Sequence, residues 1–518
     1  MKISYNWLKN YFTADISVDR ISEILTDIGL EVDGIEKCES VRGGLEGIVV
    51  GEVLTCEMHP DSDHLHVTTV NIGQAEPLQI VCGAPNVDKG QKVLVATINT
   101  TLYPAGAEDG FKIKKSKIRG VESFGMICAE DEIGIGESHD GIMVLAPEAT
   151  PGTPARDYLN MPDDYVIEIG LTPNRIDAGS HYGVARDLVA YLKANGQAAS
   201  LRLPSVEGFA IDNMSFDIPV TVEENEGAPR YAGLTIRGVK VGPSPEWLQN
   251  NLRALGLNPK NNIVDITNFV LHETGQPLHA FDGDKVRGGK IVARTCPEGT
   301  KFVTLDGIER SLSGNDLMIC DAEGPMCIAG VLGGAESGVT ESTNTVFLES
   351  AYFNPVWIRK SAKRHGINSD ASFRFERGID PDITIYALKR AAMLIKELAG
   401  GEVTSDIIDI DIAAIHEPFR FELSLTRTNN LIGKEIPATT IKSILAALDV
   451  KIENENGEIL SVAVPPYRVD VRREADLIED ILRIYGYNNV DVPQAVHSTL
   501  SYTRKPDREQ VVNIASNL

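Results

Sequence analysis

Lys112-Ile113-Lys114-Lys115-Ser116-Lys117-Ile118-Arg119 runs directly into the apolar, glycine-containing segment Gly120-Val121-Glu122-Ser123-Phe124-Gly125-Met126-Ile127-Cys128. Five cations in eight residues form an electropositive patch on a chain whose formal net charge is -25. Such a patch on an otherwise acidic molecule is typical of a surface that meets phosphate groups. The alternative is a solvated strand face, and a charge run by itself does not separate the two interpretations.

Short β-rich runs precede this stretch and are separated by Gly, Pro, Asn and Asp. They cover residues 49–53, 68–72, 79–84 and 91–96. This spacing predicts a small antiparallel barrel over residues 40–151. A five-stranded barrel of the oligonucleotide-binding type (OB-fold) is the economical fold for such a segment, and it binds single strands or RNA through one face and its loops.

Length and composition frame the rest of the chain. The 518 residues exceed one hydrophobic core, so three to five domains are expected. Apolar runs fall short of the ~18 residues that cross a bilayer, and the first residues lack a signal-peptide core, which predicts a cytoplasmic location without a membrane partner. Seven cysteines without a Cys-x-x-Cys pair fit neither a disulfide framework nor a zinc knuckle.

Changes of pattern predict a multidomain α+β protein. Residues 1–39 read as two helices, the second over 18–30, and a helical pattern resumes at 183–192. The simplest arrangement is a split N-terminal α/β domain, 1–39 and 152–204, with the barrel inserted into it. The segments beyond are a mixed α/β domain over 205–400, a small α+β domain over 401–492 with helices beginning near 436 and over 475–485, and the start of a further element over 493–518.

Several motifs occur in one order along residues 1 to about 495. In the barrel they lie at 51–53, 59–60, 81–86 and 117–128, and this set resembles the tRNA-binding barrel of several aminoacyl-tRNA synthetases. The later motifs are Leu171-Thr172-Pro173-Asn174-Arg175, Asp265-Ile266-Thr267-Asn268-Phe269-Val270, Gly275-Gln276-Pro277-Leu278-His279-Ala280-Phe281-Asp282, Phe373-Arg374-Phe375-Glu376-Arg377-Gly378 and Ile484-Tyr485-Gly486-Tyr487. Together they resemble the beta-subunit family of bacterial phenylalanyl-tRNA synthetases, which are aminoacyl-tRNA ligases.

The resemblance carries expectations about organisation and partners. It implies that 205–400 is an editing domain, that 401–492 is winged-helix-like, and that 493–518 begins a C-terminal module truncated here. The implied partners are tRNA(Phe) and an alpha subunit, in an alpha2 beta2 heterotetramer. Mg²⁺ would be shared with the alpha subunit, and ATP would be used by the holoenzyme and not bound by this chain alone.

The resemblance also implies the residues of an editing site, which would hydrolyse tRNA(Phe) wrongly charged with tyrosine. Glu349 would meet the phenolic hydroxyl, and His279 and Asn268 would lie near the ester. Gly333 would approach the substrate, and Ser369 with Ala371 would line the pocket; the family commonly has threonine at the position of Ser369. A buried hydrogen-bonding group can discriminate ~10⁴-fold, because the wrong ligand leaves it unpaired.

Each of these residues also has a structural interpretation. Asn268 could cap a turn, His279 could be a satisfied core histidine, and Glu349 could end a strand in a surface ion pair. For the editing mechanism we expect a positioned water to attack the aminoacyl ester, since the sequence offers no Ser-His-Asp arrangement or Gly-x-Ser-x-Gly elbow.

A second group of polar residues is acidic. Three carboxylates at i, i+3 and i+4 share one helix face, and a fourth precedes the helix, so all four could converge on one hard cation. The members are Asp470, Asp476, Glu479 and Asp480. The alternative is acidic residues stabilised at a helix amino-terminus with Arg472 and Arg473 as partners. The family resemblance implies the shared Mg²⁺ at these positions.

Two function classes follow. In the first, the chain is the tRNA-binding and editing part of a phenylalanine–tRNA ligase. In the second, it is a non-catalytic tRNA-binding or assembly scaffold. The joint presence of Glu349, His279 and Asn268 favours the first.

Overall fold

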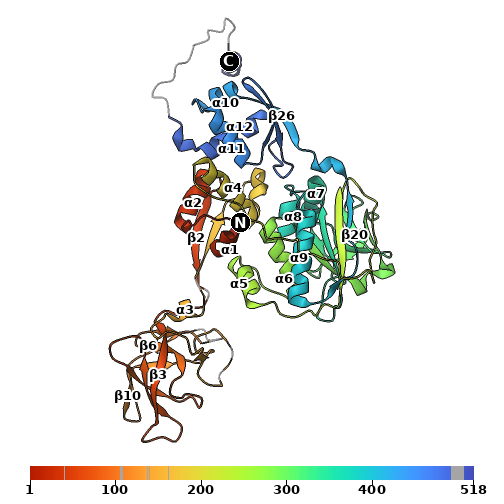
Figure 1. The fold of residues 1–518 in the computed structure, drawn as a ribbon. Helices are drawn as coiled ribbons and strands as arrows, with labels where there is room; N and C mark the ends of the chain where they lie inside the picture. The colour runs from red at the N-terminus through yellow and green to blue at the C-terminus, as the bar shows by residue number, and fades with distance from the viewer. Residues whose placement is uncertain (40, 105–108, 137, 139, 162, 492–506) are drawn as a thin grey trace.

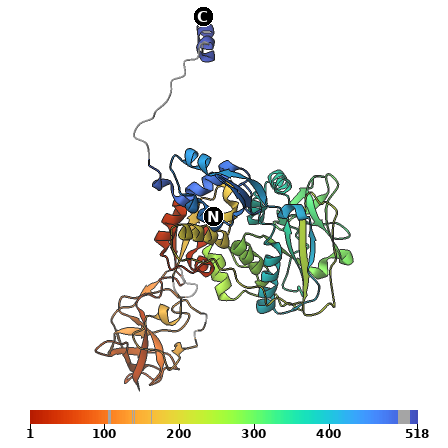
Figure 2. The same ribbon diagram turned by 45° about the horizontal axis from the view of Figure 1, so that its top comes forward.

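The computed structural model describes residues 1–39, 41–104, 109–136, 138, 140–161, 163–491 and 507–518. A β-barrel lies apart from the other elements, most of which pack into one larger body (Figure 1). Figure 2, turned by 45°, shows the same separation. The mixed α and β content predicted from the sequence is confirmed.

A three-stranded antiparallel sheet joins residues from both sides of the barrel, in the order β1-β13-β2. Cys38 at the end of β2 pairs with Asp164 at the start of β13, so the chain leaves for the barrel and returns at neighbouring positions. The elements of this split unit are β1 (Lys2–Ser4), α1 (Tyr5–Leu8), η1 (Lys9–Tyr11), α2 (Val18–Asp27), β2 (Val32–Cys38), α3 (Ala155–Tyr158), β13 (Asp164–Ile169), η2 (Pro173–Ala178) and α4 (His181–Ala194).

The expectation of two helices within 1–39 is wrong in part. The second helix exists as α2, capped by Ser17, whose side chain accepts a hydrogen bond from the Arg20 amide. The first is reduced to α1 and η1 between two strands. β1 has three residues, too few for an alternating pattern to stand out, and β13, its partner, lies more than 150 residues away.

The barrel is built on strands in the order β11-β6-β3-β4-β5. Its elements are β3 (Ile48–Met58), β4 (His66–Asn71), β5 (Leu78–Cys82), β6 (Lys92–Thr97), β7 (Thr101–Leu102), β8 (Phe111–Lys112), β9 (Ser116–Ile118), β10 (Val121–Ser123), β11 (Gly125–Ile127) and β12 (Val144–Leu145). The Phe124 amide donates to the Gln79 carbonyl at 2.9 Å, and the Val81 amide donates to Ser123 Oγ at 3.1 Å. These bonds tie the edge at β11 to β5 and nearly close the sheet, as the sequence predicted.

The largest unit, over residues 220–411, contains two sheets and is called the two-sheet unit. One sheet has the order β16-β23-β15-β24, with β25 also on β15; the other has the order β14-β17-β20-β21-β22. The elements are β14 (Val220–Val222), β15 (Arg230–Arg237), α5 (Glu246–Ala254), α6 (Asn262–Thr274), β16 (Leu278–Asp282), η3 (Gly283–Lys285), η4 (Arg287–Gly289), β17 (Ile291–Thr295), β18 (Lys301–Val303), β19 (Glu309–Ser311), β20 (Leu317–Cys320), β21 (Pro325–Ile328), β22 (Leu332–Gly333), β23 (Thr345–Tyr352), α7 (Pro355–His365), α8 (Asp370–Phe375), α9 (Thr384–Ala399), β24 (Glu402–Val403) and β25 (Ile408–Asp411).

The sheet that contains β23 is buried on both faces. Alternate residues of a strand point to opposite faces. Leu348 and Ala280 pack with apolar residues of α6 and α9, whereas Phe347 and Phe281 pack with residues of the second sheet. The helices therefore cover one face, and the second sheet covers the other.

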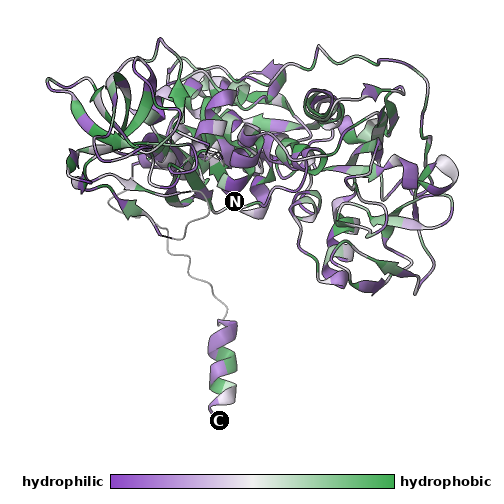
Figure 3. Ribbon diagram, turned by 90° about the horizontal axis from the view of Figure 1, so that it is seen from below, coloured by the Kyte–Doolittle hydropathy of each residue, from purple (hydrophilic) through white to green (hydrophobic). Residues whose placement is uncertain are grey.

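The last compact unit is a three-stranded sheet, in the order β26-β28-β27, with helices. Its elements are η5 (Ala413–His416), β26 (Phe419–Ser424), α10 (Leu425–Ile432), α11 (Ala438–Ala447), β27 (Lys451–Asn456), β28 (Ile459–Val464), α12 (Glu474–Tyr485) and η6 (Tyr487–Asn489). Helices predicted at 183–192 and 475–485 are confirmed as α4 and α12. Residues 492–506 lie outside the described part, so of the element expected over 493–518 only α13 (Arg508–Ser516) is seen, and none of its residues is buried (Figure 3).

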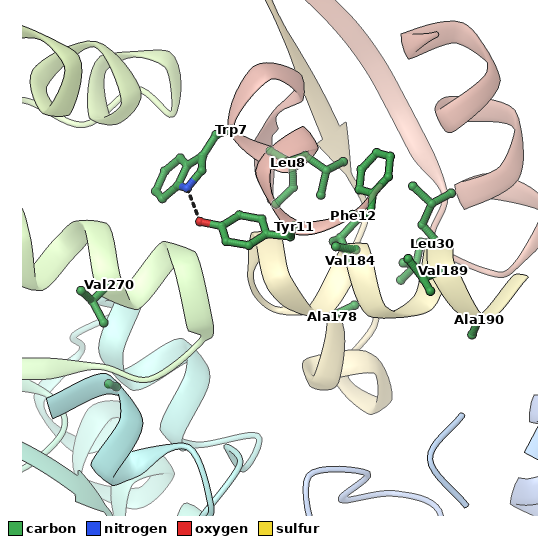
Figure 4. Packing of buried hydrophobic residues seen from close by; sticks show 14 of the residues in the cluster. Trp7, Leu8, Tyr11, Phe12, Leu30, Ala178, Val184, Val189, Ala190 and Val270 are labelled. Carbon is green, nitrogen blue, oxygen red and sulfur yellow. Dashed lines mark hydrogen bonds between the residues drawn. The ribbon is translucent and has the colours of Figure 1, made fainter. Parts of the chain in front are cut away.

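One hydrophobic core runs through the split unit, the helical side of the two-sheet unit and the last unit. Trp7 is buried in it, with its ring 3.9 Å from that of His181 and 4.5 Å from that of Phe269. Its indole Nε1–H donates to the Tyr11 hydroxyl at 2.6 Å (Figure 4). The barrel instead has clusters of its own. None of the helices among the described residues combines the length and apolar character needed to cross a membrane.

A buried network of three arginines and three aspartates joins the split unit to the last unit, with side chains at most 8% exposed. Arg483 on α12 donates to both carboxylate oxygens of Asp187 on α4, at 2.8 and 3.0 Å, and to Asp480 at 2.6 Å. The members are Arg175, Asp177, Asp187, Arg468, Asp480 and Arg483. We call this group the arginine–aspartate cluster.

Candidate functional site

The five predicted cations of the barrel all lie at its surface. Their side chains are exposed from β8 to the turn that follows β9: Lys112, Lys114, Lys115, Lys117 and Arg119. The Lys115 ammonium lies 3.0 Å from the Glu122 carboxylate and 4.8 Å from the centre of the Phe124 ring, so its charge is partly neutralised.

Arg119 is fixed more firmly than the lysines. Its guanidinium donates to the Asp61 carbonyl at 2.9 Å. The neighbouring His59 accepts a hydrogen bond from the Asp61 amide at Nδ1, so Nε2 carries the proton and donates to the Ile118 carbonyl at 3.2 Å. These contacts lock the 59–61 loop against the basic segment, and His59 serves as a structural residue.

A groove of about 590 Å³ opens beside the basic segment. Lys112 and Lys114 form one wall, and Val81 and Met126 supply apolar surface. A groove with cations at its edge and apolar surface inside suits a nucleic acid, because phosphates meet the cations and bases meet the apolar surface.

A second candidate site lies inside the two-sheet unit. His279 on β16 and Glu349 on β23 are opposite partners of an antiparallel pair. Both side chains point to the face that meets the second sheet, since they alternate with Ala280 and Leu348 on the other face. The structure therefore brings these two predicted residues together.

Glu349 is a buried carboxyl group. Tyr231 on β15 donates a hydrogen bond of 2.5 Å to its Oε2. Burial raises the pKa of Glu349 to about 7, and the bond from Tyr231 opposes that rise. A carboxyl that changes charge near neutral pH can serve as acceptor or donor toward a hydroxyl group.

His279 is neutral and incompletely bonded. Burial lowers its pKa to about 4, and within the described residues its Nε2 has no hydrogen-bond partner. A buried polar atom without a partner is uncommon and calls for an explanation. Gly333 lies over the ring: a Cβ at this position would be 2.9 Å from His279 Cε1, so any side chain there would crowd the imidazole.

Ser369 and Ala371 lie at the start of α8. Ser369 caps the helix, accepting from the Ser372 amide at 3.1 Å, and its hydroxyl donates to the Val331 carbonyl at 2.7 Å. Val331 directly precedes β22, which carries Gly333. The hydroxyl of Ser369 is thus committed to backbone bonds, and Ala371 packs at the edge of the core on the second-sheet side.

Asn268 comes from a different layer of the fold, and its place near the ester stays a prediction. It lies on α6, whose Ile266 and Val270 pack with Ala280 and Leu348 on the helical face of the sheet. His279 and Glu349 point to the opposite face. The sheet itself therefore separates the helix that carries Asn268 from the other two predicted residues.

The four acidic residues of the predicted metal site do not converge. Among the described residues no group of three His, Cys, Asp or Glu side chains is arranged to hold a metal. Asp480 is buried and bound by Arg468 and Arg483, and Asp476 accepts from Arg473 at 2.9 Å. Asp470 and Glu479 are exposed. A carboxylate held by two arginines does not fit a Mg²⁺ ligand.

Sequence reasoning missed Tyr231 and Cys327. The buried Cys327 lies close enough to Glu349 for the carboxylate to raise the thiol pKa, after the larger effect of burial. Tyr231 stands in a strand whose residues are almost all buried, so no alternation singles it out. Only the pairing of β15 with β23 brings it to Glu349.

Family models match three parts of the chain. A tRNA binding domain matches residues 48–154, a B3/4 domain matches residues 227–400, and a tRNA synthetase B5 domain matches residues 421–487. The first contains the basic segment and its groove, and the second contains His279 and Glu349.

Curated relatives match almost the whole chain. A phenylalanine–tRNA ligase beta subunit of Bacteroides fragilis is 62% identical over 501 residues, which are 97% of this chain and 61% of that protein. Those of Porphyromonas gingivalis and Salinibacter ruber are 54% and 42% identical over 98% and 100% of this chain, and 62% of each relative is covered. The chain thus spans about three fifths of the length of these relatives.

Proposed function

The chain belongs to the family of phenylalanine–tRNA ligase beta subunits, and from that premise we propose that it binds tRNA and hydrolyses a tyrosyl ester on tRNA(Phe). The barrel would hold the tRNA, and the pair of His279 and Glu349, with Tyr231, would form the editing site. The observation that carries the proposal is a buried carboxyl of raised pKa beside a buried histidine nitrogen without a partner.

Glu349 would provide selectivity. A tyrosyl phenol that reaches the carboxyl can form a hydrogen bond that phenylalanine cannot form. Desolvation of the carboxyl makes this bond costly to lose, and buried polar recognition of this kind discriminates by ~10⁴ or more. Tyr231 would hold one carboxylate oxygen in place, which limits the directions from which the substrate hydroxyl can approach.

His279 would act on the ester. Its pKa of about 4 keeps the imidazole neutral at physiological pH, so Nε2 can hold a water or take its proton. The water oxygen then bonds to the ester carbon, the bond from that carbon to the ribose oxygen breaks, and the ribose hydroxyl leaves with a proton. Gly333 would keep the imidazole in its place, because any side chain there would crowd the ring.

The whole ligase would supply the remaining parts. We propose an alpha subunit as partner, in an alpha2 beta2 heterotetramer that uses ATP and phenylalanine. The Mg²⁺ expected near α12 does not fit the carboxylates of this chain, because Asp480 is bound by two arginines. No step of the editing reaction is therefore assigned to a metal.

The test is hydrolysis of tyrosyl-tRNA(Phe) and phenylalanyl-tRNA(Phe) by this chain. We expect the tyrosyl ester to be cleaved selectively, and Glu349→Gln to lower that selectivity at least tenfold. Gln keeps the size of the side chain and can still accept from Tyr231, so the change isolates the ionisable group. Glu397→Gln, at an exposed position on α9, is the matched control.

His279→Ala should lower the hydrolysis rate and leave tRNA binding intact. Equal rates for the two esters in the unaltered chain, or full tyrosine selectivity in Glu349→Gln, would contradict the editing assignment. Binding of tRNA without hydrolysis would support the second candidate, a non-catalytic tRNA-binding scaffold. The packing of α6, the helix that carries Asn268, on the other face of the sheet is the observation that favours that candidate.

A further inference from the structure

Helix α7 carries a second concentration of positive charge that the motifs did not include. Between residues 355 and 378 the chain has six Lys or Arg and two Asp or Glu residues, in a protein of net charge -25. The exposed stripe of the helix follows i, i+3, i+4, i+7 and i+8 spacing: Val356, Arg359, Lys360, Lys363 and Arg364. Four of its five members are cations, and we call these four the α7 cationic face.

Local chemistry does not account for this face. Cations in the last turn of a helix stabilise its dipole, which explains Lys363 and Arg364 but not Arg359 and Lys360 one turn earlier. Within the described residues no carboxylate lies at salt-bridge distance from Arg359, Lys360 or Lys363. Repulsion between like charges on one helix face is unfavourable, so an external anion would relieve it.

The helix is held rigidly from below. Asp316 is buried and binds three groups of α7: it accepts from Ser361 Oγ at 2.6 Å, from Arg364 at the edge of the cationic face, and at 2.8 Å from His365. Arg310 donates to the His365 carbonyl at 2.8 Å. A fixed helix presents its cations in a constant arrangement, which lowers the entropic cost of binding.

Helix α7 is linked to the proposed editing site through α8 and β22. α7 ends at His365, and α8 begins five residues later, next to it (Figure 1). Between them Ser369 donates to Val331, and β22 then leads to Gly333 over His279. A nucleic acid whose end enters at Gly333 would therefore pass close to α7.

We propose that the α7 cationic face binds the phosphate backbone of the tRNA acceptor arm while the aminoacylated end occupies the pocket of Glu349 and His279. This inference rests on the proposed function and adds a second nucleic-acid contact, distinct from the barrel. The barrel lies apart from the two-sheet unit in both views, so the two basic surfaces would hold different parts of one tRNA (Figures 1 and 2).

The experiment compares two triple variants of the full chain. Arg359→Ala, Lys360→Ala and Lys363→Ala are combined, and Arg364 is kept because it binds Asp316. The control combines Lys193→Ala, Lys240→Ala and Lys290→Ala, which removes the same charge from exposed positions elsewhere. The probe is a fluorescent RNA hairpin with the acceptor-arm sequence, titrated at several salt concentrations, followed by hydrolysis of tyrosyl-tRNA(Phe).

In the α7 triple variant we expect the slope of log affinity against log salt to fall by about 2 to 3, since each lost phosphate contact removes about 0.7 to 0.9. KM for the tyrosyl ester should rise while kcat is kept. With Arg359→Lys in place of Arg359→Ala, the slope should recover by about 0.7 to 0.9, because one phosphate contact returns. Equal slopes and KM values in the α7 triple variant and the control triple variant would overturn the proposal. It would also be overturned if the unaltered chain did not bind the hairpin, or if polyglutamate competed for the chain as well as unlabelled hairpin does.

The two proposals fail differently. A slope that falls only in the α7 triple variant, in a chain that hydrolyses neither ester, would remove the editing function and leave the phosphate contact established.

Discussion

Glu349 is a carboxyl group that the fold buries away from water. Its ordinary pKa is 4.5, and burial raises it to about 7 in the folded chain. Between these values the folded state binds more protons than the unfolded state. The stability that Glu349 contributes is therefore complete below its unfolded pKa and is lost as the pH rises through about 7.

Relative to the unaltered chain, Glu349→Gln should therefore stabilise the fold more at pH 8 than at pH 5. A shift of this size corresponds to about 3 kcal/mol. Hydrogen exchange of peptides from β23 at both pH values, in the unaltered chain and the variant, measures the local free energy of opening. Glu397→Gln should show no such pH dependence. An equal effect of Glu349→Gln at the two pH values would mean that the carboxyl is not desolvated.

Individual residues show which features of the structure could be predicted from the sequence. The exposure of the five cations between Lys112 and Arg119 could be predicted, because a run of cations has no buried alternative. The pairing of His279 with Glu349 depends on the register of two strands 70 residues apart, which composition does not encode. Asn268 stands in a motif next to the others in sequence order, yet its helix covers the opposite face of the sheet.

Among the elements, η2 and α4 approach each other closely at a glycine. A Cβ on Gly183 would lie 2.1 Å from the Asp177 carbonyl oxygen, which is backbone and cannot rotate away. Gly183 is in the first turn of α4, where Ser180 caps the helix by accepting from the Gly183 amide at 3.0 Å. Any side chain at position 183 would push η2 and the capping residue Ser180 away from the first turn of α4.

We expect Gly183→Ala to destabilise the chain by about 1 to 3 kcal/mol, the usual cost of overpacking. The thermal unfolding midpoint, followed by circular dichroism, is the measurement. Gly242→Ala is the control, because a Cβ there would meet no heavy atom within 4 Å. Equal midpoints for the two variants would show that η2 can move away from α4 without cost.

Helices could be predicted better than strands. α4 and α12 carry apolar residues at helical spacing over more than two turns, so their existence follows from the sequence. β1 has three residues, and it becomes a strand only through its pairing with β13. The α7 cationic face was missed because its residues are separated by buried ones and form a continuous surface only on a helix.

At the scale of the whole molecule, the arginine–aspartate cluster connects the split unit to the last unit. Asp187 accepts bonds from Arg175 and Arg483, and the arginines lower its pKa against the effect of burial. Removing one partner of a buried ion pair leaves the other charges uncompensated, which commonly costs 3 to 5 kcal/mol, as a rough figure.

Asp187→Asn should therefore weaken the attachment of the last unit. We expect a lower thermal midpoint and faster proteolysis between β25 and β26. Asp491→Asn is the control, because this side chain is 95% exposed in its ion pair with Lys434 and should change stability by less than about 1 kcal/mol. Unchanged proteolysis in Asp187→Asn would show that the shared hydrophobic core alone holds the units together.

The cluster could not be predicted from the sequence. The sequence predicts Asp480 as one of four carboxylates around a cation, because its spacing on the helix suits a metal ligand as well as an ion-pair partner. Its partners Arg468 and Arg483 are close in sequence, but Asp187 and Arg175 come from a unit almost 300 residues earlier. Which anion an arginine meets depends on the packing of whole units.

The chain leaves the split unit for the barrel and returns to it at neighbouring positions. This arrangement has a consequence for folding during synthesis on the ribosome. β2 is complete when Cys38 has been made, but its partner in the sheet begins only at Asp164. At translation rates of about 5 to 20 residues per second, the strand waits on the order of ten seconds. The barrel has hydrophobic clusters of its own and can fold during that interval. The inserted domain can therefore be folded before the split unit that surrounds it is complete.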